Sequence, residues 1–442
     1  MKNTVALLML FSCATPIEST EKTLPPALND LSDIDDTNHP KSSENIDEEF
    51  DEDDAQGPDV PEADTDSEVS FIESSVPYPI DVAPEPRDTC ADGPWPVPDW
   101  ETGAPEDHGM STEKLQAAAM YAGSEQTQCM LVAKDGVIVG EWYWGITADT
   151  KVKNWSVAKS YAATVVGAAI DDGYLDNLDS PIADYVEEWQ GTNKDVVSIH
   201  DMLSMSSGLR FGLFRDNVLM ALAGNMTRRA LNNPLRNTPG DLWEYNNHTV
   251  QVAEPLLRAA TGMNPQDYAT ERLWEPMGMS VNWEEDRQGH AAMYMNTKAN
   301  CRDQLKFGYL YLRKGCWNGE QLLSRDFVET ATSPSTEMNQ GYGYWWWLNG
   351  GEPTLDSVTF DPHPEGMLHP HAPEDNFCAV GLGNQFIEVM PSLDMVVVRI
   401  GFAPQENLSL WATEGAVLDA LLEDGEQHMH NHLLELILEA VE

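Results

Sequence analysis

An apolar run that begins at Ser156 predicts a long, largely buried helix. Its apolar residues recur three and four positions apart, and the run ends at Asp171-Asp172-Gly173, where glycine is a typical helix stop. The residues that carry this pattern are Val157, Ala158, Tyr161, Ala162, Val165, Val166, Ala169 and Ile170. Lys159 follows Ser156 by three positions, so a helix places the hydroxyl and the ammonium group on one face.

This serine–lysine pair has the chemistry of an activated nucleophile. A serine hydroxyl attacks a carbonyl only when a base accepts its proton, and a lysine in an apolar wall holds its own proton weakly enough to be that base. The unpaired N–H groups at the start of a helix would stabilise an oxyanion. The same spacing occurs at Ser19–Lys22 and Ser111–Lys114, so the pair alone leaves a nucleophile and an ordinary helix cap equally open.

Strand patterns stand on both sides of a helix-rich middle. Residues 129–133 and 137–144 predict a hairpin, and residues 342–347, 377–390 and 395–400 are strand-like. Helices are predicted over residues 111–122, 197–205, 249–261, 267–274, 301–313 and 411–422. This order indicates an α+β domain over residues 96–442, with one antiparallel sheet built from both ends and a helical insertion over about residues 185–330.

A second candidate site element is Tyr245-Asn246-Asn247, which precedes a predicted helix. A tyrosine near a positive charge has a lowered proton affinity and can shuttle a proton, and the amide of Asn247 could orient Lys159 and a substrate carbonyl. Tyr294-Met295-Asn296 has the same pattern. A helix start capped by asparagine explains Tyr245-Asn246-Asn247 without any catalytic role.

A third candidate element is Gly381-Leu382-Gly383, which interrupts an apolar strand pattern. Glycine within a strand often marks the close approach of another backbone or of a ligand. A substrate along this edge would meet exposed N–H groups, and the N–H of Asn384 would pair with that of Ser156 around an oxyanion. A plain β-bulge is an equally good interpretation.

The charge of the chain excludes classes of partner. With 74 acidic and 25 basic residues the net charge is −49, which argues against nucleic acid and anionic membrane surfaces. Residues 14–95 hold 24 acidic residues against Lys22, Lys41 and Arg87, a net of −21, which leaves −49 + 21 = −28 elsewhere. A segment this acidic cannot bury enough apolar surface to fold. We therefore predict that residues 13–95 form a disordered tether. Calcium binding or cation-dependent adhesion by this segment is a weaker interpretation, because no calcium-ligand spacing with a turn glycine appears.

The first residues predict export. One positive charge, a short apolar run to Phe11 and then Ser12-Cys13 are typical of a lipoprotein signal peptide over residues 1–12. Cys13 would then carry the lipid and anchor the protein to the outside of a bacterial membrane, whether on the periplasmic or the cell-surface side. An ordinary secretory signal is the alternative.

Five cysteines remain after Cys13, so at least one is unpaired. They are Cys90, Cys129, Cys301, Cys316 and Cys378. Cys301 and Cys316 flank a helix whose length would hold them about 20 Å apart, too far to bridge each other. We predict that Cys90 pairs with Cys129, because Cys90 ends the tether and Cys129 begins a strand. No pair has the close spacing of a zinc site, and we expect neither a metal nor a cofactor.

Taken together and in this order, the three elements resemble the β-lactamase-related serine hydrolases, which include class C β-lactamases, DD-peptidases, family VIII-type esterases and 6-aminohexanoate-dimer hydrolases. The resemblance covers roughly residues 96–420. Further landmarks that carry it are Ser206-Ser207-Gly208-Leu209, Pro239-Gly240 to Asn247, Leu273 to Met279, and Asp303 through Trp317-Asn318-Gly319-Glu320 to Leu323. It implies a β-lactamase/transpeptidase-like fold.

The resemblance also implies roles for single residues. Ser156 would be the acylated nucleophile, Lys159 its base, Tyr245 a second proton carrier and Asn247 an orienting residue. The third family motif is usually Lys-Thr-Gly, but Gly381 stands in the place of its lysine. The expected cation for a substrate carboxylate is therefore missing, which favours an esterase or amide hydrolase acting on a small ester, amide or peptide over a β-lactamase or DD-carboxypeptidase. A penicillin-binding sensor that is acylated without turnover is another alternative.

Overall fold

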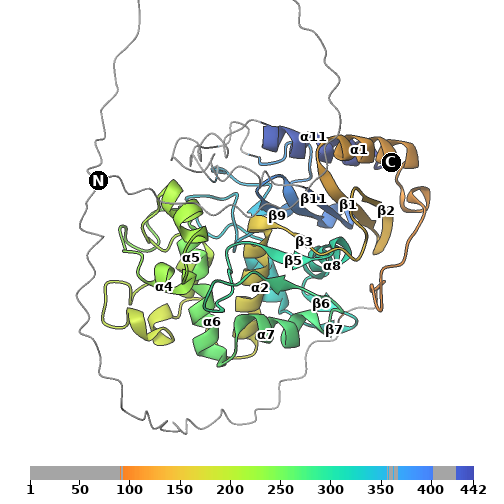
Figure 1. The fold of residues 1–442 in the computed structure, drawn as a ribbon. Coiled ribbons are helices and arrows are strands. Elements are labelled where there is room, and N and C mark those ends of the chain that lie inside the picture. Colours follow the sequence, from red (N-terminus) through yellow and green to blue (C-terminus); the bar gives the residue numbers. More distant parts are fainter. Residues whose placement is uncertain (1–89, 91–92, 356, 358–361, 363–366, 402–424) are drawn as a thin grey trace, which may run out of the picture. The chain divides into compact units, whose positions relative to one another are not determined.

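The computed structural model describes residues 90, 93–355, 357, 362, 367–401 and 425–442 (Figure 1). Its main sheet is antiparallel and has the strand order β2-β1-β11-β10-β9-β8. The strands are β1 (Thr127–Lys134), β2 (Val137–Tyr143), β8 (Trp347–Leu348), β9 (Phe377–Gly381), β10 (Gln385–Met390) and β11 (Met395–Gly401). The first hairpin therefore pairs with the last long strand, which confirms the prediction of one sheet built from both ends.

Helices cover both faces of this sheet. On one face α1 (Thr112–Ser124) packs beside α11 (Gly425–Glu439) over an apolar core that includes Met130 and Val132 of β1. On the other face lie α2 (Ala158–Asp171) and α8 (Cys301–Leu312), over a larger core that includes Leu131. The alternation of these residues along β1 is what a strand covered on both sides requires.

The segments between the two halves of the sheet are mostly short helices, whose colours run from yellow through green to blue-green in Figure 1. They are η4 (Ile182–Asp184), η5 (Glu187–Trp189), α3 (Ile199–Leu203), η6 (Arg215–Leu219), α4 (Met226–Leu231), α5 (Asn247–Gln251), α6 (Ala253–Thr261), α7 (Pro265–Ala269), η7 (Thr270–Trp274) and α9 (Arg325–Ala331). Smaller elements are η2 (Pro105–His108), β3 (Val152–Lys153), η3 (Trp155–Val157), β4 (Asn282–Trp283), β5 (Thr297–Ala299), β6 (Cys316–Trp317), β7 (Glu320–Gln321) and η8 (Pro391–Leu393). The single helix predicted over 249–261 is interrupted near Val252, because Pro255 has no N–H to donate to the carbonyl of Gln251.

Two strand predictions after residue 340 are wrong in detail. The aromatic run 342–347 is mostly irregular, and only its last residue belongs to β8; Trp345 has a positive φ of 58°. The segment 377–390 is a hairpin of β9 and β10, not one interrupted strand. Gly383 and Asn384 turn the chain with φ values of 78° and 55°, a left-handed conformation that glycine and asparagine adopt most readily.

Two disulfides connect parts of the chain that are distant in sequence. Cys90 pairs with Cys316 and Cys129 with Cys301, so the predicted Cys90–Cys129 pair is wrong. Cys129 is buried on the face of β1 that meets the first turn of α8, a contact between segments 172 residues apart that no local pattern reveals. Cys378 is the unpaired cysteine of the described residues and is buried.

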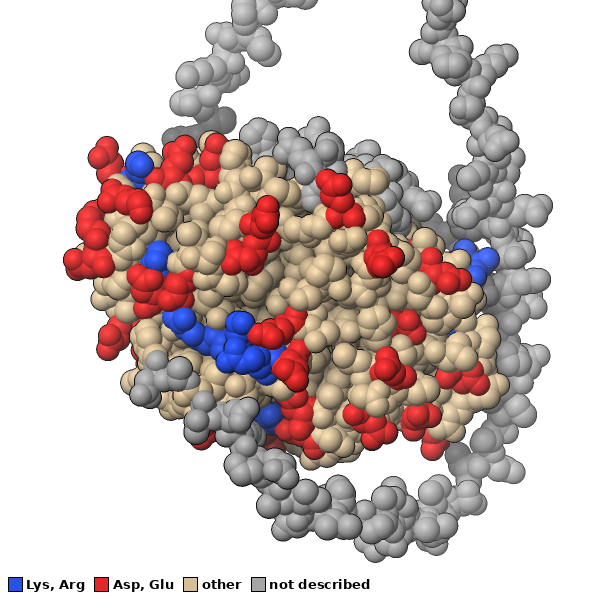
Figure 2. All heavy atoms as spheres, turned by 180° about the vertical axis from the view of Figure 1, so that it is seen from behind, with Lys and Arg blue, Asp and Glu red and all other residues tan. Residues whose placement is uncertain are grey.

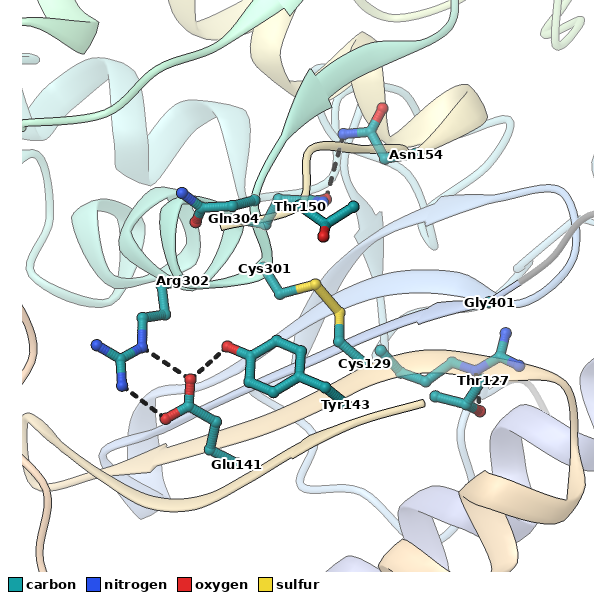
Figure 3. The surroundings of a disulfide bond; sticks show 12 residues. Thr127, Cys129, Glu141, Tyr143, Thr150, Asn154, Cys301, Arg302, Gln304 and Gly401 are labelled. Atoms are coloured by element: carbon teal, nitrogen blue, oxygen red, sulfur yellow. Dashed lines mark hydrogen bonds and ion pairs between the residues drawn. A yellow bond between two sulfur atoms is a disulfide. The ribbon is translucent and has the colours of Figure 1, made fainter. Parts of the chain in front are cut away.

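A second connection lies beside the Cys129–Cys301 disulfide (Figure 3). Arg302 donates from Nε and from a terminal nitrogen to the two carboxylate oxygens of Glu141, each at 2.7 Å, and the hydroxyl of Tyr143 also donates to Glu141. Bidentate arginine–carboxylate pairs are among the stronger polar contacts. The hairpin of β1 and β2 is therefore attached to α8 by both covalent and polar bonds.

Acidic side chains are scattered over the face seen in Figure 2, whereas Lys and Arg gather mainly in one group. No helix among the described residues has the length and apolarity needed to span a membrane. The predicted signal peptide, Cys13, most of the acidic tether and the predicted helix 411–422 lie outside the described residues. Helix α11, which begins just after that predicted helix, was not predicted.

Candidate active site

Ser156 and Lys159 meet at the start of α2, as their spacing predicted. Ser156 lies in the 3₁₀ turn η3, and Lys159 is in the first turn of α2. Lys159 Nζ donates to Ser156 Oγ at 2.9 Å and to the backbone carbonyl of Tyr294 at 2.8 Å. The amine therefore has two neutral acceptors, one of which is the candidate nucleophile.

Burial lowers the proton affinity of Lys159. The side chain is 1% exposed, and it forms no ion pair with any described residue. Loss of hydration lowers the pKa of Lys159 to about 7, and the nearby negative charge of Asp216 opposes the shift. Near neutral pH a large fraction of this amine is therefore unprotonated and able to accept the proton of Ser156.

Tyr245 completes the cluster. Lys159 Nζ lies 4.8 Å from the centre of its ring, which stacks on Trp347 with ring centres 5.8 Å apart. Burial raises the pKa of Tyr245 well above its usual range, and a hydrogen bond with the Ser156 side chain opposes this only in part. The predicted fall in proton affinity is wrong because loss of hydration outweighs the nearby amine. These shifts leave the Tyr245 phenol protonated at neutral pH, so Lys159 is better suited than Tyr245 to accept a proton.

Gly381 ends β9 directly beside the loop that carries Ser156. A Cβ atom on Gly381 would lie 2.5 Å from the carbonyl oxygen of Asn154 and 2.9 Å from the backbone nitrogen of Ser156, closer than real Cβ contacts allow. The predicted close approach of another backbone is therefore present, and it explains why this position is glycine. Because β8 pairs only with Phe377 and Cys378, residues 379–381 form no ladder with it.

Asn247, Gly383 and Asn384, the other predicted site residues, form hydrogen bonds with residues other than Ser156 and Lys159. The amide of Asn247 donates to the carbonyl of Asp216 and to Asn217 Oδ1, both at 3.2 Å, and Tyr294 rather than Asn247 holds Lys159. The carbonyls of Gly383 and Asn384 accept hydrogen bonds from Arg399 at 2.6 and 2.9 Å. The predicted pairing of the Asn384 and Ser156 N–H groups around an oxyanion stays a prediction.

Two contributors were missed by the sequence analysis. Tyr294 acts through its carbonyl, which every residue type has, although its ring also lies 6.0 Å from Lys159 Nζ. In the sequence, Tyr294-Met295-Asn296 is distinguished only as a second match to the tyrosine pattern. Asp216 is fully buried and accepts from His248 Nδ1 at 2.8 Å, a pairing across 32 residues that has no local signal.

The aromatic residues of the run 342–347 are buried in the core. Tyr342 packs edge-on against Trp347 with ring centres 4.7 Å apart, and both rings contact Tyr245. These two rings therefore fix the position of the Tyr245 phenol, whereas Trp346 packs against Phe307 and Tyr311 of α8, deeper in the domain.

Comparison with known proteins finds a matching family, related sequences and similar folds. The sequence profile of the beta-lactamase family matches residues 113–400. The chain is 23% identical to a 6-aminohexanoate-dimer hydrolase from Paenarthrobacter ureafaciens over 66% of this chain and 77% of that protein. Similar folds include the hydrolase EstCE1, described as having promiscuous acyltransferase activity (TM-score 0.53, 14% identity, 70% of this chain and 97% of that one). A penicillin-binding protein homologue from Caulobacter crescentus is also similar (TM-score 0.50, 15% identity, 66% and 92%).

Proposed function

Since the chain belongs to the beta-lactamase family and is a serine hydrolase, we propose that it cleaves ester or amide bonds through an acyl-enzyme on Ser156. One observation carries the proposal: a buried lysine with a pKa of about 7 donates to the serine hydroxyl at 2.9 Å. A structural lysine would instead be expected to have a carboxylate partner or access to water.

The first step is acylation. The unprotonated amine of Lys159 takes the proton of Ser156 as Oγ attacks the substrate carbonyl. The backbone N–H of Ser156, together with an N–H from the turn 382–384 beside Gly381, would stabilise the oxyanion. Tyr245, which is protonated at the start of the step, passes its proton to the leaving alcohol or amine. Lys159 then reprotonates Tyr245. In the second step water attacks the acyl group and restores Ser156.

The substrate class follows from the groups around the site. Gly381 takes the place of the lysine that binds a substrate carboxylate in β-lactamases and DD-peptidases, so we propose uncharged esters and linear amides as substrates. The partly buried ring of Tyr245 favours an apolar acyl or leaving group. The relative named 6-aminohexanoate-dimer hydrolase is in accord with a linear amide.

A substrate panel tests this proposal. Hydrolysis of p-nitrophenyl butyrate, the linear dimer of 6-aminohexanoate, a D-alanyl-D-alanine peptide and nitrocefin should be compared for the wild type and Ser156→Ala. We expect turnover of the ester or the dimer and at most slow turnover of nitrocefin. Rapid nitrocefin hydrolysis would contradict the substrate class, and covalent labelling by penicillin without any turnover would instead indicate a sensor.

We also propose that the protein is exported and anchored by a lipid on Cys13. The two disulfides support an oxidising compartment, because such bonds persist mainly outside the cytosol. In a bacterial host the wild-type chain should fractionate with membranes, and Cys13→Ala should be released into the soluble exported fraction. Equal membrane association of both proteins would contradict the anchor.

A further inference from the structure

A second cluster of reactive side chains lies on the face of the sheet opposite α2. Cys378 of β9 and Glu388 of β10 are direct partners in the antiparallel ladder, so their side chains point to the same face. His369 comes from the loop before β9, and His430 comes from α11, which covers this face in Figure 1. All four side chains are at most 4% exposed.

The donor atoms of this cluster have the separations of a metal site. Cys378 Sγ lies 3.6 Å from His369 Nε2, which lies 3.4 Å from Glu388 Oε1. Tetrahedral zinc, with bonds of about 2.0–2.3 Å, holds neighbouring ligand atoms roughly 3.3–3.6 Å apart. His430 Nε2 is 2.7 Å from Glu388 Oε1 and needs to move by less than about 1 Å to meet the same geometry.

Neighbouring residues orient these donors. His369 Nδ1 hydrogen-bonds Asn431 Oδ1 at 2.6 Å, which leaves Nε2 directed at the cluster. Asn376 donates to the second carboxylate oxygen of Glu388 at 2.8 Å. Hydrogen bonds of this kind on the outer side of histidine and carboxylate ligands are the usual support of metal sites.

Two atoms at the centre are left unsatisfied by the protein. Glu388 Oε1 and His430 Nε2 are buried, and although they lie close together, neither makes a hydrogen bond of acceptable geometry with any described residue. A buried polar atom without a partner is costly, and a cation held between the two would remove that cost.

The sequence around the cluster is enriched in histidine. Six of the 11 histidines fall in two short segments, residues 363–371 and 428–432. Short histidine-rich tracts are a compositional sign of metal binding, and these two tracts supply His369 and His430.

We propose that His369, Cys378, Glu388 and His430 bind a Zn²⁺ ion. One thiolate, two imidazoles and one carboxylate suit zinc better than calcium or magnesium, which prefer oxygen ligands alone. Four protein ligands in a closed site leave no open position for a reacting water, so the ion is structural. It fastens α11 and the loop before β9 to the β9–β10 hairpin, whose far end borders Ser156.

Metal analysis of the purified full chain tests this site. We expect about one zinc per chain, and for the cobalt-substituted protein the intense thiolate-to-metal absorption and tetrahedral visible bands of a Cys-containing site. Cys378→Ser should abolish the thiolate band and weaken retention of zinc at least tenfold, and His430→Gln should likewise weaken retention. Removal of zinc by a chelator should lower the melting temperature of the wild type.

Two control variants separate the site from its surroundings. His432→Gln changes a partly exposed histidine of the same helix, whose Nδ1 pairs with Glu435 at 3.1 Å, and should keep full zinc content. Ser156→Ala should also keep it, which makes the result independent of the proposed hydrolysis. Failure of the folded wild type to bind zinc at micromolar concentrations, or a cobalt spectrum unchanged by Cys378→Ser, would overturn the proposal.

Discussion

Strand β9 has a polar cluster at each of its two ends, and the two clusters differ in how their buried groups are satisfied. At the Gly381 end, the single ionisable amine of Lys159 is held by a hydroxyl and a carbonyl, both of them neutral. At the Cys378 end, several donor atoms converge on one point, and two of them lack a hydrogen bond.

The difference indicates two kinds of function. A buried amine that keeps its hydrogen bonds but lacks a counter-ion is set to exchange a proton, as a catalytic base must. A cluster of buried nitrogen, oxygen and sulfur atoms, in which one carboxylate oxygen and one imidazole nitrogen lack a hydrogen bond, is suited to hold a cation. Substitutions in the cluster beside Gly381 should therefore change turnover. Substitutions in the cluster beside Cys378 should change metal content and stability.

The largest effect on turnover is expected from the serine–lysine pair. Ser156→Ala and Lys159→Met should each lower kcat by at least about 10³-fold, and the double variant should be little worse, because the two groups act as one unit. Steady-state kinetics on the best ester substrate checks this. Multiplicative losses in the double variant would show that the two residues act independently.

Tyr245→Phe comes next. Removal of the phenolic proton donor should lower kcat by about 10²–10³-fold with little change in KM, since proton transfer is required only in the transition state. Tyr309→Phe is the matched control, because its hydroxyl donates to the carbonyl of Pro94 far from Ser156. An unchanged kcat for Tyr245→Phe would remove Tyr245 from the mechanism.

Gly381→Ala should have an intermediate effect. The new methyl group would displace the Ser156 backbone, and a shift of that size should cost about 10–100-fold in kcat/KM. Gly224→Ala is the control, since its Cβ would meet only Arg287 Cδ at an ordinary 3.9 Å. If the two variants are equally active, the close approach of β9 to Ser156 does not matter for catalysis.

The change of kcat/KM with pH near neutrality should be smaller than the effects of these substitutions. With a pKa of about 7 for Lys159, kcat/KM should fall about tenfold per unit below that pH and level off above it. Between about pH 7 and 10.5 the folded chain binds fewer protons at this residue than the unfolded chain, so its contribution makes the free energy of unfolding rise with pH. A rate profile flat from pH 5 to 8 would contradict the assignment of the base.

The smallest effect on turnover is expected from the other end of β9. Cys378→Ser should change kcat/KM by less than about threefold at temperatures where the variant stays folded, because residue 378 lies about 10 Å along the strand from Gly381. Its melting temperature and zinc content should fall instead. If folded Cys378→Ser loses as much activity as Gly381→Ala, the two clusters are not functionally separate.

Local patterns predicted the elements whose signals are local. The apolar spacing after Ser156 and the turn Lys134-Asp135-Gly136 were enough for α2 and the first hairpin, and the serine–lysine spacing placed both side chains correctly. Contacts between distant segments were not predictable in this way. Cys129 meets Cys301 only after β1 and α8 have packed, and Tyr245 gains its raised pKa only once Tyr342 and Trp347 bury it.

Other features of the two clusters depend on contacts that residue types do not determine. Asn247 was expected to hold Lys159, but a backbone carbonyl holds it instead. The two histidine tracts are a sequence signal for the second cluster, whereas no cysteine pair has the close spacing of a zinc site. That cluster forms from a loop, a strand pair and a helix, so its ligands are up to 61 residues apart, 430 − 369.

Covalent labelling of the full chain tests the central claim most directly. A fluorophosphonate should add one label to the wild type, and peptide mapping should place it on Ser156. Ser156→Ala should take no label, and Lys159→Met should label much more slowly. A label on any other serine, or ester turnover that persists in unlabelled Ser156→Ala, would contradict the account.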